Sequence, residues 1–246
     1  MSSAEKLAKI ERGNTSPGVN REIIEYLLTL GTNFEGQYFL DVPCGDGAFL
    51  EAVKDFFPGS KTVGGDLNAP RAVFSHEFLP IDGQRAVSIP KDKKFKVVTS
   101  ISGVMEFDNT LAFFEKLRES LDENAFFIVT NDNLVSVRDR FLYLLFGRFR
   151  QYRAFIPNDQ PTWKIVHLQN LLRILAEAGF EALEIKYVTP KKSEWLWLPF
   201  ALPIYAFQYF YMRFGEKEIS FAEKQRSRPF MSLLARHYIV ICRPQR

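Results

Sequence analysis

Cysteine is scarce in this sequence of 246 residues, which contains only Cys44 and Cys242. Two cysteines cannot form the disulfide framework of a small secreted domain, so we expect a protein of the reducing cytoplasm. An excess of one charge is also missing, because 32 basic and 29 acidic side chains leave a net charge of +3. So small an excess does not predict binding to nucleic acid. The sequence also lacks His-x-x-x-His and Cys-x-x-Cys spacings, so we expect no metal site.

Long hydrophobic runs are missing as well. The only uncharged stretch of membrane length, residues 195–212, contains Pro199, Pro203 and Gln208, which predicts a poor membrane-spanning helix. The first residues show no apolar run of the kind found in a signal peptide. Aromatic side chains, in contrast, are abundant, with 24 Phe, 9 Tyr and 3 Trp.

Short apolar runs alternate with segments of helical periodicity along most of the chain. We predict seven strands, at residues 38–42, 62–66, 78–81, 95–102, 125–130, 182–188 and 237–242. We predict helices between them, including residues 20–30, 48–57, 109–121 and 167–178. This alternation predicts an α/β fold with a doubly wound, mostly parallel, seven-stranded sheet. Residues 1–36 are expected to form an N-terminal helical cap on a domain of residues 37–246, and residues 134–163 and 191–236 are expected to be helical insertions on its substrate side.

The sharpest local signal is the loop after the first predicted strand, Asp41-Val-Pro-Cys-Gly-Asp-Gly47. A strand that runs through Gly45 and Gly47 into a helix lets its backbone approach a ligand closely. Asp66 ends the next predicted strand, where a carboxylate can bind both hydroxyls of a ribose. Leu50 stands where the NAD fingerprint requires a third glycine, and a carboxylate at Asp41 would repel a pyrophosphate. The loop therefore favours a cationic nucleoside cofactor and disfavours a nicotinamide-dependent reductase.

Together these residues resemble a known family. The pattern Asp41-x-Pro43-x-Gly45-x-Gly47 followed by Asp66 is similar to the cofactor loop of class I S-adenosylmethionine-dependent methyltransferases, although that family usually has glycine where Pro43 stands. Further similar segments follow in the family's order, at residues 82–85, 95–100, 104–107 and 167–180. The resemblance covers about residues 20–190 and the last strand. It implies a Rossmann-like methyltransferase fold and S-adenosylmethionine as cofactor.

The resemblance also implies roles for individual residues. Gly45 and Gly47 would lie under the methionine part of the cofactor, and Asp41 near its amino group. Asp66 would bind the ribose hydroxyls and Asp82 the adenine amino group. The whole implied cofactor set is Asp41, Pro43, Gly45, Gly47, Asp66, Leu67, Asp82, Gly83, Ser100, Ile101 and Ser102. The alternatives are a plain strand–helix turn at the two glycines and an ordinary Asp-Gly turn at residues 82–83.

Few catalytic residues are expected, because the sulfonium already activates the methyl group and the protein mainly aligns the acceptor. A hydroxyl acceptor benefits from a general base, and His167 and Glu106 are the candidates, with Asp132 as a further carboxylate. Each could instead cap a helix or support another side chain. Phe107 stands where many family members carry a histidine. His237, at the start of the last strand, is expected to cap or pair locally.

The two insertions point to the acceptor. Residues 134–149 place apolar side chains on one helical face, and five arginines between residues 138 and 153 accompany a single acid, Asp139. Residues 195–214 hold nine aromatic side chains between basic flanks, and their prolines predict a broken or re-entrant element. Such segments fit contact with a membrane surface through residues 134–153 and 195–214, but they also fit a lid, a homodimer interface or ordinary core packing.

The resemblance implies a methyltransferase, and with the two insertions it leads us to expect methylation of an oxygen on a small, glycan or lipid-linked acceptor by a cytoplasmic enzyme, which could be peripheral on the inner face of the membrane. The alternative is a non-catalytic scaffold subunit of a membrane-associated assembly, which retains the cofactor fold without its activity.

Overall fold

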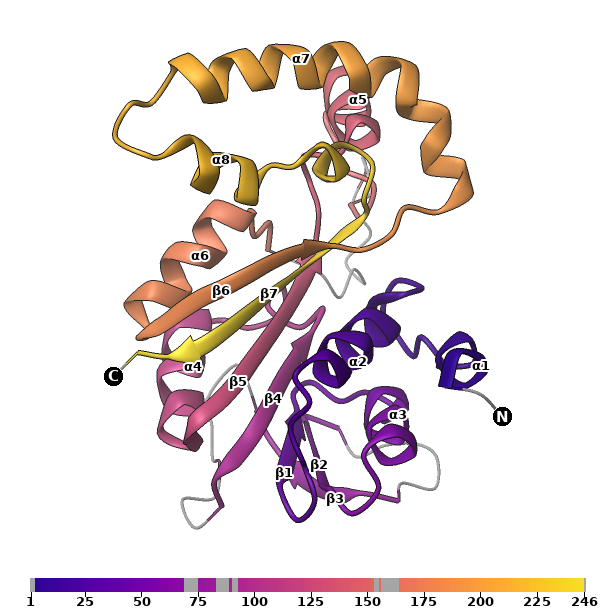
Figure 1. Cartoon of the computed structure of the whole chain (residues 1–246), viewed down its shortest axis with the longest axis vertical. Coiled ribbons are helices and arrows are strands. Elements are labelled where there is room, and N and C mark those ends of the chain that lie inside the picture. Colours follow the sequence, from indigo (N-terminus) through magenta and orange to yellow (C-terminus); the bar gives the residue numbers. More distant parts are fainter. Residues whose placement is uncertain are drawn as a thin grey trace.

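A seven-stranded sheet forms the centre of the molecule (Figure 1). The computed structural model describes residues 3–68, 75–82, 89, 93–152, 155 and 164–245. The strand order is β3-β2-β1-β4-β5-β7-β6, and all neighbours are parallel except β7, which is antiparallel to β5 and β6. The strands are β1 (Tyr38–Asp41), β2 (Lys61–Asp66), β3 (Glu77–Pro80), β4 (Phe95–Ile101), β5 (Leu121–Asp132), β6 (Phe180–Tyr187) and β7 (His237–Pro244). The predicted fold class and all seven predicted strands are confirmed.

Helices cover both faces of the sheet. One face carries α1 (Ser3–Ala8), α2 (Val19–Thr29) and α3 (Ala48–Phe56), and the other carries α4 (Thr110–Glu119) and α6 (Leu168–Glu177). Residues 1–36, the expected cap, contain α1 and α2, and α2 buries Ile23, Ile24 and Leu27 against the sheet. The apolar side chains of α2 therefore form part of the main core.

Side chains that alternate along β5 and β7 point to opposite faces of the sheet and so belong to two separate core layers. On β5, Phe126 and Ile128 face the α2/α3 side, whereas Phe127 and Val129 face the α4/α6 side. On β7, Ile239 and Ile241 face the α2/α3 side, whereas Tyr238, Val240 and Cys242 face the α4/α6 side. Successive strand side chains point to opposite faces, so two neighbouring residues of β7 contribute to different surfaces of the molecule.

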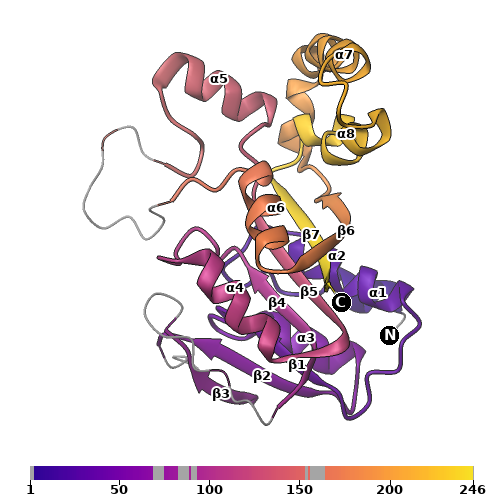
Figure 2. The same cartoon turned by 90° about the vertical axis from the view of Figure 1, so that its left-hand side faces the viewer.

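The remaining helices lie beyond the carboxyl edge of the parallel strands (Figure 2). The first insertion contains α5 (Val137–Phe146), and the second contains α7 (Leu198–Phe214) and α8 (Phe221–Ser227), with 3-10 turns at Lys192–Trp197 and Phe230–Leu233. A small separate core joins these elements and includes the buried residues Val137, Ala201, Leu233 and Leu234. The insertions thus form a packed layer above the edge where parallel α/β sheets bind their ligands.

The prediction of a broken element at residues 195–214 is wrong. After the 3-10 turn, α7 continues without interruption through Pro199 and Pro203. Pro199 lies in the first turn, where its missing N–H would have no helical partner. Pro203 removes one helical hydrogen bond near the exposed start of the helix, where water can bind the freed carbonyl. Among the described residues, no helix is both long enough and apolar enough to cross a membrane.

Candidate active site

The loop after β1 borders a cavity at the carboxyl edge of the sheet. Gly45 and Gly47 have φ values of +54° and +83°, in the left-handed region that glycine adopts without strain. Gly47 is the residue that precedes α3, so the loop passes directly into a helix N-terminus, where backbone N–H groups are available to a ligand.

The cavity has a volume of about 180 Å³ and gathers residues from four separate segments. Its lining consists of residues 12–15 and 43–46 together with Asn20, Asp41, Ala48, Phe49, Asp66, Ile101, Ser102 and Glu106. Six members of the predicted cofactor set are among them, namely Asp41, Pro43, Gly45, Asp66, Ile101 and Ser102. The structure thus brings the core of that set to one place.

The other predicted cofactor residues lie outside the lining of this cavity. Gly47 begins α3 beside it, and Leu67 follows Asp66 with its side chain 57% exposed. Ser100 is buried within β4, and Asp82 follows β3. Gly83 falls outside the described residues.

Asp66 holds the loop in position. Its carboxylate accepts the N–H of Gly45 at 3.0 Å and the N–H of Asn68 at 3.2 Å. The end of β2 is therefore joined to the β1 loop by a charge-assisted hydrogen bond, while Asp66 still lines the cavity. A carboxylate has about four lone-pair sites, so these two bonds leave capacity for hydroxyl groups of a ligand.

The cavity is lined by more acidic than basic side chains. Four carboxylates line it, from Asp41, Asp46, Asp66 and Glu106, whereas Arg12 is the lone cationic side chain in that lining. Burial raises the pKa of Glu106, and the nearby charge of Asp66 raises it further. Such a donor set fits a cationic ligand, as expected for a cofactor with ammonium and sulfonium groups.

Among these carboxyl groups, Asp41 shows the strongest preference for a cationic ligand. Its side chain is buried, and burial raises its pKa to about 8, although a hydrogen bond from Thr99 at 2.6 Å acts in the opposite direction. The charge of Asp66 raises this pKa further. A positive group bound in the cavity would offset the desolvation of the Asp41 carboxylate and favour its ionised form.

A chain of polar side chains leads from the cavity into the protein. The hydroxyl of Ser102, on the cavity wall, lies 3.1 Å from Nε2 of His237, and Nδ1 of His237 lies 3.1 Å from Oδ1 of Asp132. Thr15, also on the wall, lies 2.9 Å from the same hydroxyl. Ser102 directly follows β4 with a φ of +58°, and its N–H donates to the hydroxyl of Thr130 at 3.1 Å. The register of β5 and β7 places Asp132 opposite His237.

The imidazole of His237 is arranged to accept a proton from Ser102. The contact between Nδ1 and Asp132 has ion-pair distance but not the geometry of a regular hydrogen bond. Since a carboxylate can only accept, we assign the ring hydrogen to Nδ1, on the side of Asp132, and the lone pair to Nε2. Burial lowers the pKa of His237, with Asp132 opposing this effect and Arg150 adding to it. The ring is therefore neutral near pH 7. Gln151 donates to Asp132 at 2.8 Å and holds the carboxylate in place.

Residues 16–185, more than half of the chain, match a family described as a methyltransferase domain. The chain belongs to this methyltransferase family. The predicted family, enzyme class and cofactor are thereby confirmed. No curated protein matches the sequence.

Several solved structures share the fold of this chain at low sequence identity. A S-adenosylmethionine-dependent methyltransferase from Archaeoglobus fulgidus superimposes with a TM-score of 0.54 at 16% identity, covering 92% of this chain and 95% of its own. An O-methyltransferase from a polyketide synthase of Brevibacillus brevis, in complex with S-adenosylhomocysteine, gives 0.53 at 16% identity, covering 94% and 82%. A mycolic acid cyclopropane synthase complexed with S-adenosylhomocysteine and CTAB gives 0.56 at 14% identity, covering 98% and 94%.

The two predicted catalytic residues of the methyltransferase lie in different places. Glu106 lines the cavity beside the β1 loop, which also holds six members of the predicted cofactor set. His167 precedes α6 as its cap, where its side chain accepts the N–H of Gln169 at 3.3 Å, and it lines a separate cavity. Burial lowers the pKa of His167, and Arg228 lowers it further. The structure therefore does not bring His167 together with the cofactor residues.

The sequence interpretation missed two parts of the site. Residues 12–15 and Asn20 line the cavity from the N-terminal segment, whose polar sequence carries no recognisable motif. The expectation that His237 pairs locally is wrong, because its partners Ser102 and Asp132 follow or end other strands. The signal would have been the strand order, which places the start of β7 beside the end of β5.

Proposed function

We propose that this methyltransferase acts on an oxygen of its acceptor and that Ser102, His237 and Asp132 remove the acceptor proton. The observation that carries this proposal is the contact between the Ser102 hydroxyl, on the wall of the cofactor cavity, and a buried neutral imidazole. A nitrogen or carbon acceptor has less need of such a base, whereas a hydroxyl must lose its proton.

The cavity residues would hold the cofactor by charge and hydrogen bonding. We assign the amino group of S-adenosylmethionine to Asp41, its ribose hydroxyls to Asp66, its methionine part to the loop at Gly45 and its adenine amino group to Asp82. When bound, S-adenosylmethionine supplies a methyl group already activated by the sulfonium charge. The carboxylates of the cavity support this assignment because they favour a cationic ligand.

The proton would leave the acceptor through Ser102. The acceptor hydroxyl donates to Oγ of Ser102 while the hydrogen of Ser102 passes to Nε2 of His237. The imidazolium that forms lies 3.1 Å from Asp132, whose carboxylate stabilises it. The acceptor oxygen exchanges its proton for the methyl group, and the positive charge moves to His237. Thr15 holds the Ser102 hydroxyl by a hydrogen bond at 2.9 Å.

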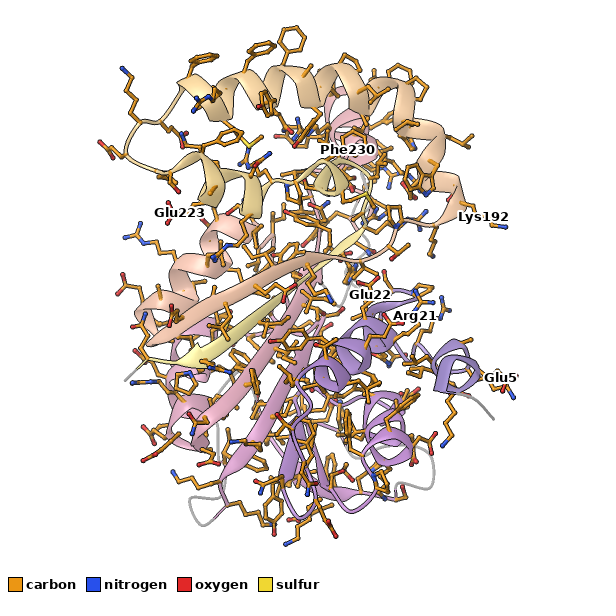
Figure 3. All side chains as sticks on the ribbon, in the orientation of Figure 1. Glu5, Arg21, Glu22, Lys192, Glu223 and Phe230 are labelled. Carbon is orange, nitrogen blue, oxygen red and sulfur yellow. The ribbon has the colours of Figure 1, made fainter. Side chains whose placement is uncertain are left out.

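We further propose that the acceptor has an apolar part and is taken up at a membrane surface. Exposed apolar side chains, here called the apolar ridge, lie on α5, on the 3-10 turn before α7 and on α7 itself: Tyr143, Leu144, Leu145, Phe146, Leu196, Phe200, Leu202, Phe207, Phe210 and Phe214. Side chains on the outer side of α7 project away from the sheet (Figure 3). Exposed cations lie near both ends of α7, at Lys192, Arg213 and Lys217. Aromatic rings flanked by cations favour the headgroup region of a membrane.

The arginines of the first insertion contribute less to the proposed membrane contact than their number suggests. Arg138 pairs with Glu194 at 3.1 Å, and Arg150 lies 3.4 Å from Asp139. These contacts hold α5 to the rest of the protein. The exposed rings and aliphatic chains, and not the arginines, therefore support the proposed membrane contact. The same ridge also fits a homodimer interface, which vesicle and sedimentation measurements separate from membrane binding.

The test is a comparison of binding and turnover in His237→Gln. Methyl-labelled cofactor is incubated with extract of the native host, and the labelled product is analysed for an O-methyl group. We expect His237→Gln to bind S-adenosylhomocysteine like the unmodified protein and to lose about 10²–10⁴-fold in turnover. Ser102→Ala should give a similar loss, whereas His167→Gln should retain turnover if His167 is only a helix cap.

Two outcomes would contradict the proposal. One is a product methylated on nitrogen or carbon. The other is full turnover by His237→Gln with an unchanged pH profile. Binding of S-adenosylhomocysteine without any turnover in every extract would instead favour the non-catalytic scaffold.

A further inference from the structure

We infer that the protein has a second ligand site, for an amphipathic acid, on the face of the sheet opposite the proton relay. A cavity of about 290 Å³ lies among α6, α7, α8 and the adjoining strands. Tyr238 lines it, whereas the preceding residue, His237, belongs to the relay. Alternation along β7 places these two side chains on opposite faces. Within the described part of the chain, this cavity and the cofactor cavity share no lining residue.

Two cationic side chains, Lys224 and Arg228, line this second cavity. Lys224 donates to the backbone carbonyls of Met212 and Gly215 at 3.2 and 2.5 Å, which leaves Arg228 for an external ligand. Among the described residues, no hydrogen bond or ion pair engages the Arg228 guanidinium, although its charge lowers the pKa of the neighbouring His167.

In the described structure, neither Glu216 nor Glu223 forms an ion pair with Arg228. Glu216 accepts from Tyr211 at 2.7 Å, and Glu223 accepts from Ser220. Arg228 is therefore available to bind an anionic group from outside the chain.

Two further polar atoms on the wall have unmet hydrogen-bonding capacity. The hydroxyl of Tyr238, a residue only 1% exposed, lies beside the Asn131 side chain but makes no hydrogen bond of regular geometry to it or to another described residue. Oε1 of Gln208, also buried, is likewise without a partner in the described structure. Buried polar groups are normally hydrogen-bonded, so a ligand with oxygen atoms at these points would satisfy them.

The remaining wall is apolar and includes Leu134, Leu168, Leu172, Met212 and Ile219. The volume has room for about ten water-sized groups, which corresponds to a short chain with one acidic end. A carboxylate or a phosphate monoester on such a chain matches Arg228 with its charge and the apolar wall with its tail. Because α7 and α8 belong to the insertion and α6 to the main domain, this ligand would also join the two.

Calorimetric titration of the full chain with octanoate, octyl phosphate and octanol tests this site. We expect saturable 1:1 binding of at least one acid, at least tenfold tighter than octanol, with the two acids distinguishing a carboxylate site from a phosphate site. Arg228→Gln should weaken acid binding about tenfold or more, and Tyr238→Phe several-fold. Arg226→Gln is the matched control, because Arg226 is exposed on α8 and does not line the cavity.

Binding of S-adenosylhomocysteine should be unchanged in all three variants, which also shows that they are folded. The inference is overturned if neither acid binds, if octanol binds equally well, or if Arg226→Gln weakens binding as much as Arg228→Gln. It is equally overturned if S-adenosylhomocysteine displaces the acid, since the acid then occupies the cofactor cavity. Should Arg228→Gln not fold, unchanged acid binding by Tyr238→Phe overturns it.

Discussion

At the end of β1, the free protein buries the carboxyl group of Asp41 without a cationic partner among the described residues. Asp41 is 2% exposed, and burial raises its pKa to about 8. Its hydrogen bond from Thr99 does not compensate for the lost hydration. The residue thus favours a bound cation at the expense of the stability of the free protein, a pattern common at functional sites.

Asp41→Asn should therefore stabilise the free protein while it weakens cofactor binding. A group whose pKa rises on folding destabilises the folded state progressively as pH rises from its unfolded pKa to its folded pKa. The melting temperature of Asp41→Asn should exceed that of the unmodified protein by several degrees near pH 7.5, at about 2–4 °C per kcal/mol for a chain of this size. The difference should shrink toward pH 4. Scanning calorimetry at several pH values measures it, and an Asn variant less stable than the unmodified protein at neutral pH would contradict it.

Cofactor binding should depend on pH through the same carboxyl group. Below about pH 8 the free protein holds Asp41 protonated, and a bound ammonium group requires the ionised form. The affinity for S-adenosylhomocysteine should therefore rise by up to about tenfold per pH unit between about pH 6 and pH 8 and then level off. Calorimetry in buffers of different ionisation enthalpy would detect the released proton. Asp41→Asn is the control, and its affinity should show a much flatter pH profile.

At the scale of single residues, the sequence predicted the site where one short motif contained it. Asp41, Pro43 and Gly45 lie on one loop, and Asp66 ends the neighbouring strand, so adjacency in the chain predicted adjacency in space. His237 could not be placed in this way. Its partners end or follow other strands, and only the complete strand order brings them within hydrogen-bonding distance.

The insertion helices differ from the core helices in what they leave exposed. On α3, the apolar side chains Phe49, Leu50 and Val53 are buried, whereas on α7 the rings of Phe207 and Phe214 are 78% and 70% exposed. Periodicity predicted the helix α3, and the segment that contains α7 was expected to be a helical insertion, but neither prediction distinguishes an apolar face covered by a sheet from one left uncovered. That difference depends on the position of each helix relative to the sheet, which no local pattern records.

If the apolar ridge contacts a membrane, Phe207→Glu should reduce vesicle binding without affecting the cofactor site. Full burial of one phenylalanine contributes about 1.5–3 kcal/mol, so we expect a loss of at least about tenfold in partitioning to vesicles of phosphatidylcholine and phosphatidylglycerol. Thr32→Glu, on the exposed loop after α2, adds the same charge away from the ridge and is the matched control. Flotation assays measure the binding, and calorimetry checks that the affinity for S-adenosylhomocysteine is unchanged.

A different result would assign the ridge to a second copy of the chain. In that case the unmodified protein would sediment as a dimer without lipid, Phe207→Glu would sediment as a monomer, and neither would float with vesicles. Equal vesicle binding by Phe207→Glu and Thr32→Glu would exclude the ridge as the contact surface.

The molecule as a whole arranges its surfaces around one sheet. The cavity beside the β1 loop is lined from the α3 side by Ala48 and Phe49, and the second cavity is lined from α6 by Leu168 and Leu172. The insertion helices α5, α7 and α8 lie beyond the strand ends, and α5 and α7 carry most of the apolar ridge (Figures 1 and 2).

The α/β alternation of the sequence predicted the sheet and its parallel character because each strand and helix has its own periodicity. It could not predict where the insertions pack, since their contacts, such as that of Arg138 with Glu194, join residues far apart in the chain.

The weak net charge of the whole molecule leads to a prediction about the force that holds it to vesicles. With a net charge of +3, and with Arg138 and Arg150 engaged in internal ion pairs, long-range attraction to an anionic surface is small. Raising salt from about 0.1 M to 1 M shortens the Debye length from about 10 Å to 3 Å and screens that attraction, whereas apolar burial is not weakened. Vesicle binding should therefore fall by less than about threefold over this range. The opposite result would be a loss of vesicle binding of more than about tenfold at high salt, together with a similar loss for Arg213→Gln at low salt. It would show that the cations at the ends of α7, and not the apolar ridge, supply most of the binding.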